Sequence, residues 1–172
     1  VCATDISPVS VEVMKSRFSN YNQFSSMEVD MEKLPFTDAS FDIVCSAGSL
    51  SYGDNSIVMN EIYRVLRPKG RMISVDSLDN NPIYRFNRFV HFLRGNRSIS
   101  TLKRMPNVNL IKNYVDKFEY SEVKYFGSIT WLLPILSKIL NDEKTTLFSN
   151  YFDKIINTKK SAFKFTMLLI KK

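Results

Sequence analysis

The sequence is poor in the residues that build metal clusters and disulfide frameworks. It has two cysteines, Cys2 and Cys45, and one histidine, His91, among 172 residues. No Cys-x-x-Cys pair occurs, so we expect no metal centre. Both cysteines lie in apolar, strand-like stretches. We therefore expect them to be buried free thiols in a reducing compartment.

Long hydrophobic runs are also missing. The longest apolar patch, WLLPIL at 131–136, is interrupted by proline. It is much shorter than the ~20 residues that span a bilayer. The start of the chain has neither a basic segment nor a long apolar run, unlike a signal peptide. These absences predict a cytoplasmic protein that is at most peripheral to a membrane.

Acidic residues are absent from one long stretch. Residues 85–104 contain six Lys or Arg and no Asp or Glu, in a chain with a net charge of +7. A local cationic surface favours an anionic partner such as a phosphate, a nucleic acid or a lipid headgroup. A solvated helix face with loops explains the same composition. The charge alone therefore does not distinguish a binding surface for an anionic partner from an ordinary solvent-exposed surface.

The residues that are present predict one α/β domain. Hydrophobic residues make up 44% of the chain, which excludes disorder and provides a sizeable core. Ser7 and Pro8 predict one helix start, and Asp54 or Asn55 predicts another, which stops at residues 67–70. Between the helices, strands are expected at 1–6, 24–31, 41–47 and 71–77. This β-α-β-β-α-β order is typical of a doubly wound, mostly parallel sheet with helices on both faces. Residues 31–40 are too few for a long crossover helix and predict a turn or a short helix.

The second half of the chain has a different composition. Residues 80–117 are rich in Asn, Arg and aromatic residues, and an apolar stripe at helical spacing contains Phe86, Phe89, Val90 and Leu93. Strands are expected in YSEVKYFGS and in SAFKFTMLLIKK, and a helix in TWLLPILSKIL.

Small polar residues and carboxylates follow three of the expected strands. Open α/β sheets bind ligands beyond the carboxyl ends of their strands. Asp5 ends the first strand, where a carboxylate can accept both hydroxyls of a ribose. Asp30 and Met31 follow the second strand, and Ser46, Ala47 and Gly48 end the third. A lone Asp at a strand end is more often a helix cap or a turn residue, but together these groups predict an adenosine-shaped site.

Two longer segments add a family resemblance. DMEKLPFTDASFDIVCSAGSLSYGD, followed by NEIYRVLRPKGRMISVD, resembles the small-molecule branch of the class I S-adenosylmethionine-dependent methyltransferases. The resemblance covers residues 1–77. It implies that Asp5 and Ile6 contact the ribose of S-adenosyl-L-methionine, that Asp30 and Met31 flank the adenine, and that Ser46, Ala47 and Gly48 lie along the methionine part. The LPF segment, 34–36, is expected only to pack the strand entry.

The resemblance extends weakly to the rest of the chain. EVKYF (122–126) and FKFTMLLI (163–170) would form the antiparallel strand pair that closes this fold. NPIYRFNRFVHFLRGNRSISTLKRMP is similar to an insertion in methyltransferases of bacterial cell-surface glycan synthesis. A small-molecule, saccharide or lipid-linked saccharide acceptor is therefore expected, with no specific nucleic-acid partner. We expect residues 80–117 to form a lid, in which a phosphate group contacts four arginines: Arg85, Arg88, Arg94 and Arg97. Alternatively, the lid rests on an anionic membrane.

One part of the family pattern does not occur. The glycine-rich loop that follows the family's first strand has no counterpart, because the glycines lie at 48, 53, 70, 95 and 127. We therefore expect the domain to be incomplete at its N-terminus, with a strand, this loop and a helix upstream of Val1. The chain alone is then expected to bind the cofactor poorly.

Methyl transfer from a sulfonium requires alignment, and a base only when the nucleophile carries a proton. His91 is the natural candidate for a base, although a helical histidine between Val90 and Phe92 is more often a packing residue. Tyr52, just beyond the third strand, is expected to shape the acceptor pocket.

Two other functions agree with parts of the sequence. A nicotinamide-dependent oxidoreductase also carries an acid after its second strand, but the Tyr-xxx-Lys pair of short-chain dehydrogenases is missing. A non-catalytic, methyltransferase-like binding protein for nucleic acid or anionic lipid also agrees with the basic, aromatic composition.

Overall fold

The computed structural model describes residues 1–95, 98–156 and 161–172. The predicted β-α-β-β-α-β order of residues 1–77 is present, and the α/β class is confirmed. In chain order the elements are β1 (Cys2–Asp5), α1 (Pro8–Arg17), β2 (Ser25–Glu28), β3 (Phe41–Ala47), α2 (Asn55–Val65), β4 (Leu66–Ser77), α3 (Pro82–Leu93), α4 (Ile99–Lys103), α5 (Val108–Lys117), β5 (Tyr120–Phe126), the 3-10 turn η1 (Thr130–Leu132), α6 (Leu133–Leu136), α7 (Asp142–Ile155) and β6 (Lys164–Ile170).

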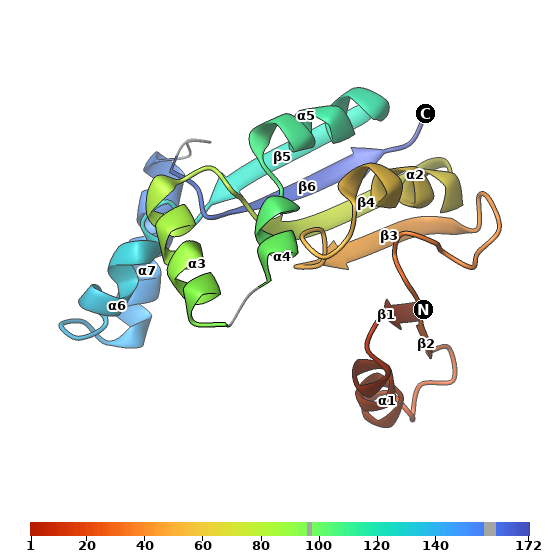
Figure 1. The fold of residues 1–172 in the computed structure, drawn as a ribbon, viewed down its shortest axis with the longest axis horizontal. Coiled ribbons are helices and arrows are strands. Elements are labelled where there is room, and N and C mark those ends of the chain that lie inside the picture. The colour runs from red at the N-terminus through yellow and green to blue at the C-terminus, as the bar shows by residue number, and fades with distance from the viewer. Residues whose placement is uncertain (96–97, 157–160) are drawn as a thin grey trace.

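The strands form two sheets within the described residues. β1 and β2 are parallel, and β3 pairs in parallel with β4 in a second sheet of order β3-β4-β6-β5. β6 is antiparallel to both β4 and β5, so the predicted C-terminal antiparallel pair is present. Figure 1 shows the small sheet and α1 standing apart from the larger sheet, on the side of β3. The parallel strands are therefore divided between two sheets.

Local capping explains where the first helices begin. The Ser7 hydroxyl accepts a hydrogen bond from the Ser10 N–H (3.4 Å), and Pro8 occupies the first turn of α1. The Asp54 carboxylate accepts from the Ser56 N–H (2.9 Å) at the start of α2. α2 ends at Val65, because β4 begins immediately, two residues before Pro68.

The core lies on one face of the larger sheet. Along β4, Met72, Ser74 and Asp76 are buried, whereas Ile73 and Val75 on the opposite face are exposed. Figure 1 shows α2 and α5 on the same side of this sheet. Their apolar faces join the strands in a cluster that contains Leu50, Val58, Ile62, Leu66, Met72, Leu78, Ile111, Tyr114, Phe118, Ala162, Phe165, Met167 and Leu169. Burying one such side chain stabilises the fold by roughly 1.5–3 kcal/mol, so this layer holds the larger sheet together.

The apolar stripe predicted within residues 86–93 faces solvent instead of a core, and α1 also exposes apolar residues. In α1, Val9 and Val13 are exposed, and the buried residue is Val11. In α3, Phe86 is 69% exposed, and Phe89 and Leu93 are also exposed. α3 packs through the other side of the helix, because Tyr84 donates to the Gly127 carbonyl (2.9 Å) and accepts from the Trp131 N–H (3.0 Å). Helical spacing identified the amphipathic helix but not which face packs.

Other expectations for the second half need correction. α5 packs into the core through Ile111 and Tyr114, and the lid at residues 80–117 stays a prediction. The helix expected at 130–140 is broken into η1 and α6, and α7 was not predicted. Cys45 is exposed and Cys2 only half-buried, because both lie beside an open cleft rather than in the core. Within the described residues, every helix is too short or too polar to cross a bilayer.

Candidate functional site

A cleft of about 580 Å³ lies between β1 and β3, next to the loop that precedes α2. It is lined by β1, by residues after β2, by β3 and by the loop at residues 48–53. The parallel strands β1, β2 and β3 contribute residues at their carboxyl ends, where open α/β sheets bind ligands. Its size is within the range of cofactor sites, and its lining mixes apolar side chains with a few carboxylates and hydroxyls.

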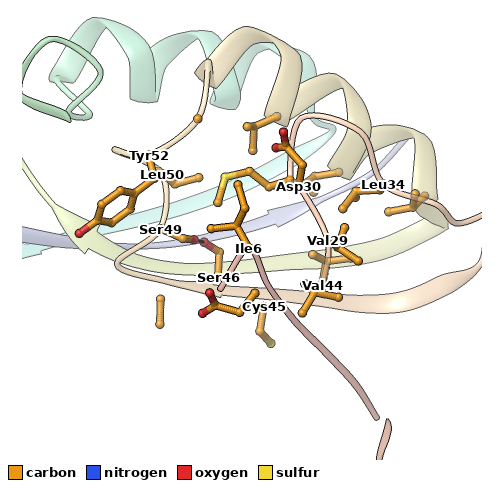
Figure 2. Close-up of a pocket in the computed structure, with 18 of the residues that line it drawn as sticks. Ile6, Val29, Asp30, Leu34, Val44, Cys45, Ser46, Ser49, Leu50 and Tyr52 are labelled. Carbon is orange, nitrogen blue, oxygen red and sulfur yellow. Dashed lines mark hydrogen bonds between the residues drawn. The ribbon is translucent and has the colours of Figure 1, made fainter. Parts of the chain in front are cut away.

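All of the predicted cofactor contacts line this cleft: Asp5, Ile6, Asp30, Met31, Ser46, Ala47 and Gly48. Figure 2 shows Ile6 extending toward Ser46 and Ser49, with Asp30 and Tyr52 on opposite sides of the same cleft. The strand ends that the sequence identified therefore converge on one site.

The two carboxylates each fix a local turn. Asp5 Oδ1 accepts a hydrogen bond from the Ser7 N–H (2.8 Å), and Asp30 Oδ1 accepts from the Glu32 N–H (2.9 Å). These bonds orient the side chains without using the full capacity of a carboxylate, which has about four acceptor sites. Each carboxylate can thus accept from a turn N–H and from a ligand hydroxyl at the same time. The two roles considered for a strand-end Asp, a turn residue and a cofactor contact, are therefore compatible.

The loop after β3 is tightly folded. Gly48 has a left-handed backbone (φ +69°) and donates its N–H to the Val75 carbonyl (2.9 Å). The Ser46 and Ser49 hydroxyls are hydrogen-bonded at 2.6 Å. Leu50 donates its N–H to the buried Asp76 carboxylate (2.9 Å). Together these bonds fix the backbone along one wall of the cleft.

Gly53 allows this loop to approach the segment after β2. A Cβ at position 53 would lie 2.7 Å from Val58 Cγ2 and 3.1 Å from Met31 Sδ. Real Cβ atoms avoid contacts below 3.0 Å. The missing side chain therefore brings Met31, the predicted adenine contact, against the wall of the cleft.

An ion pair in α2 supports the LPF segment. Arg64 donates to the carbonyls of Leu34 (3.0 Å) and Phe36 (2.7 Å) and to Glu61 Oε2 (2.8 Å), and Glu61 in turn accepts from the Leu34 N–H (2.8 Å). The hydrogen bond from Arg64 lowers the pKa of Glu61, and the carboxylates of Glu61 and Asp38 raise the pKa of Arg64. Both groups are thereby held in their charged forms beside the cleft.

The sequence did not identify the residues that join α4 to the rim. Arg104 Nη1 donates to the Tyr52 carbonyl (3.1 Å) and lies 3.7 Å from Glu32 Oε1. Glu32 Oε1 also accepts from the Asp54 N–H (2.6 Å). These partners are more than 20 residues apart, so no local spacing signals them.

The predicted catalytic residues are not placed together. Tyr52 lines the cleft and is 65% exposed at its rim. His91 is half-buried in α3 and is not among the residues that line the cleft. Figure 1 shows α3 at the far end of the larger sheet from β1. The structure therefore does not bring His91 to the site.

The predicted phosphate-binding arginines are also separated from the cleft lining. Arg85 and Arg94 are exposed on α3 and at its C-terminal end, and Arg85 lies 3.6 Å from Asp79 Oδ2. Arg88 is buried, donates to the Leu78 carbonyl (3.0 Å) and to Asp79 Oδ1 (3.3 Å), and lies over the Phe163 ring. Arg88 therefore connects α3 to the sheet. Arg97 lies outside the described residues.

Known proteins that are similar to this chain include methyltransferases. Residues 1–74 match the family described as "Methyltransferase domain". The uncharacterised methyltransferase YodH of Bacillus subtilis (strain 168) is 32% identical over 84 residues, which is 48% of this chain and 36% of that protein. The sterol 4-C-methyltransferase of Caenorhabditis elegans is 35% identical over 80 residues, which is 44% of this chain and 24% of that protein. Over residues 1–74 the chain is therefore similar to class I S-adenosylmethionine-dependent methyltransferase domains.

Solved structures extend the likeness to the whole chain. The geranyl diphosphate C-methyltransferase of Streptomyces coelicolor, in complex with S-adenosyl-L-homocysteine, has a TM-score of 0.66 at 14% identity and covers 100% of this chain and 64% of its own. This likeness shows that the chain has the methyltransferase fold. These matches agree with the predicted resemblance, and the S-adenosyl-L-homocysteine bound to that neighbour agrees with the predicted cofactor, S-adenosyl-L-methionine. The chain spans only 24–36% of the two curated relatives named above.

Proposed function

We propose that the protein transfers a methyl group from S-adenosyl-L-methionine to a small molecule. The observation that carries the proposal is the single cleft where Asp5, Asp30 and Ser46 meet. Its groups suit the cofactor, since carboxylates accept hydroxyl hydrogens and Met31 and Ile6 supply apolar surface for a ring. The cofactor supplies the methyl group on a sulfonium, which a nucleophile attacks in line.

In this proposal each lining residue has one task. Asp5 accepts hydrogen bonds from the ribose hydroxyls, with Ile6 beside it. Asp30 and Met31 flank the adenine. Ser46, Ala47 and Gly48 leave space for the methionine part, and Tyr52 contacts the acceptor at the rim. With His91 outside the cleft lining, the chain positions its reactants and does not itself supply a histidine base.

Binding of S-adenosylhomocysteine tests these roles. Calorimetry should show roughly 10-fold weaker binding for Asp5→Asn and for Asp30→Asn, because a hydrogen bond to a charged group contributes about 1.5–3 kcal/mol. Asp42→Asn is the matched control, because Asp42 lies on β3 outside the cleft lining and pairs with Arg67 at the surface. Equal affinities for all three variants and the wild type would contradict the assignment.

We further propose that the acceptor is a saccharide or lipid-linked saccharide that carries a phosphate, as in cell-surface glycan synthesis. The similarity of residues 81–106 to an insertion in such enzymes supports it, and this segment carries the exposed Arg85 and Arg94, although both lie outside the cleft lining. The relatives suggest only a small molecule, because they are named for substrates such as sterol, ubiquinone or menaquinone, and geranyl diphosphate. Methyl transfer to nucleotide sugars and lipid-linked sugars, and its loss in Arg85→Gln/Arg94→Gln, would test this choice against unphosphorylated glycosides.

The exposed face of α3 favours a second role, a peripheral contact with an anionic membrane on the cytoplasmic side. Phe86, Phe89 and Leu93 are exposed beside Arg85 and Arg94, which is the composition of an interfacial helix. Sedimentation with vesicles should show binding to phosphatidylglycerol that Phe86→Ser/Phe89→Ser abolishes. Equal sedimentation with pure phosphatidylcholine would exclude it. Vesicle binding without cofactor binding would instead favour a non-catalytic binding protein.

A further inference from the structure

Asp76 is a buried carboxylate to which the proposed function assigns no role. It lies near the C-terminal end of β4, on the core face of the sheet, and is 3% exposed. Its Oδ2 accepts a hydrogen bond from the Leu50 N–H (2.9 Å), and its Oδ1 accepts from the Ser77 N–H (2.8 Å). Asp76 therefore joins the loop at 48–53 to β4 from behind the cleft.

The loop has a second attachment to the same strand. Gly48 donates its N–H to the Val75 carbonyl (2.9 Å), the residue before Asp76. Ser49 lies between the two attachments and is hydrogen-bonded to Ser46, and its carbonyl accepts from the Tyr52 N–H (3.0 Å). These bonds hold the backbone from Gly48 to Tyr52, which forms one wall of the cleft and part of its rim.

The attachment through Asp76 has an energetic cost. Burial raises the pKa of Asp76, although the backbone hydrogen bonds from Leu50 and Ser77 and the charge of Lys164 oppose the rise. A neutral side chain would avoid this cost of desolvation. A carboxylate, however, holds a backbone N–H by a charge-assisted hydrogen bond, which is shorter and stronger than a neutral one.

We propose that Asp76 is a positioning residue for methyl transfer: by fixing the backbone at Leu50, it aligns the wall that holds the methyl donor with the rim that holds the acceptor. The proposal rests on the proposed function. Alignment is the main contribution of the protein to such a displacement, and a shift of ~1 Å can cost about 100-fold in rate. Asp76 needs no contact with either reactant for this effect.

The test compares Asp76→Ala and Asp76→Asn with Ser74→Ala. Ser74 is the matched control, because it is buried two residues earlier on the same face, and its hydroxyl has no hydrogen-bond partner in the described part of the chain. We expect Asp76→Ala to lower kcat roughly 10- to 100-fold, with KM and S-adenosylhomocysteine affinity within about 3-fold of wild type. Asp76→Asn should restore part of kcat, because its amide oxygen still accepts from Leu50. Ser74→Ala should keep kcat within about 2-fold.

Amide hydrogen exchange provides a readout that does not depend on activity. The Leu50 amide should exchange faster in Asp76→Ala than in the wild type, while the Gly48 amide, bonded to Val75, should keep its protection. A kcat that stays at the wild-type value in Asp76→Ala would overturn the proposal, as would a fall in kcat without faster exchange at Leu50. If Asp76→Ala does not fold, the test rests on Asp76→Asn. A wild-type kcat in Asp76→Asn together with faster exchange of the Leu50 amide would then overturn the proposal. Absence of S-adenosylhomocysteine binding both by the wild-type chain and by a form extended upstream of Val1 would instead overturn the proposed function.

Discussion

Single residues decide how closely the walls of the cleft approach one another. Gly53 permits the contact between its loop and Met31, and Gly48 permits the left-handed turn that begins the loop. Neither requirement is visible in composition, since both arise from atoms that are near only in the folded chain. The two glycines act differently: a Cβ at Gly48 would have no neighbour within 4 Å, so only backbone strain opposes a substitution there.

We expect Gly53→Ala to destabilise the fold by about 1–3 kcal/mol, because the new methyl group must displace Val58 or Met31. Urea unfolding measures the change. Gly48→Ala is the comparison, with a cost of about 1–2 kcal/mol from the left-handed backbone. Gly53→Ala should also weaken S-adenosylhomocysteine binding, because it moves Met31. Unchanged stability in Gly53→Ala would show that the loop relaxes freely.

At the scale of elements, α2 links the larger sheet to the segment after β2. One face of α2 contributes Val58 and Ile62 to the core, and Glu61 and Arg64 hold the LPF segment on another side. The sequence predicted the helix and its cap, because hydrophobic spacing and capping are local. It did not predict the ion pair's partners, which lie up to 30 residues away.

We expect Arg64→Ala to loosen residues 34–38 without unfolding α2, because two backbone carbonyls and two carboxylates lose their donor. Faster amide exchange at Leu34 and faster cleavage after Lys33 by trypsin are the measurements. Arg67→Ala is the control. Its ion pair with Asp42 is exposed, and such pairs contribute only ~0–1 kcal/mol. Equal protection of Leu34 in both variants would mean that packing alone holds the segment.

At the scale of the whole molecule, the two sheets differ in how well they are packed. The core cluster begins at Leu50 and belongs to the larger sheet, whereas residues 1–30 contain only Val11 and Val29 as buried hydrophobic residues. Local stability follows buried apolar contact. The unit formed by β1, α1 and β2 is therefore the weaker side of the cleft (Figure 1).

We expect amides of β1 and β2 to exchange at least about 10-fold faster than those of β4 and β6. S-adenosylhomocysteine at 100 times its Kd should raise the protection of β1 by up to ~2.7 kcal/mol, since a ligand that requires both sides of the cleft suppresses their separation. Exchange measured with and without the ligand tests both statements. Uniform protection across the two sheets would contradict the first.

The sequence by itself determined the secondary structure near the first caps, the order of strands and helices in residues 1–77, and the residues at the strand ends. These features depend on spacing and on neighbours within a few residues, as the hydrogen bonds of Asp5, Asp30 and Asp54 show. Only the tertiary structure decided that the stripe of α3 faces solvent, that Arg88 is buried and that α5 joins the core. It also decided that β1 and β3 stand in separate sheets with the cleft between them. Periodicity specifies that a helix has an apolar side or that a strand alternates, but which surface covers that side depends on contacts between distant segments.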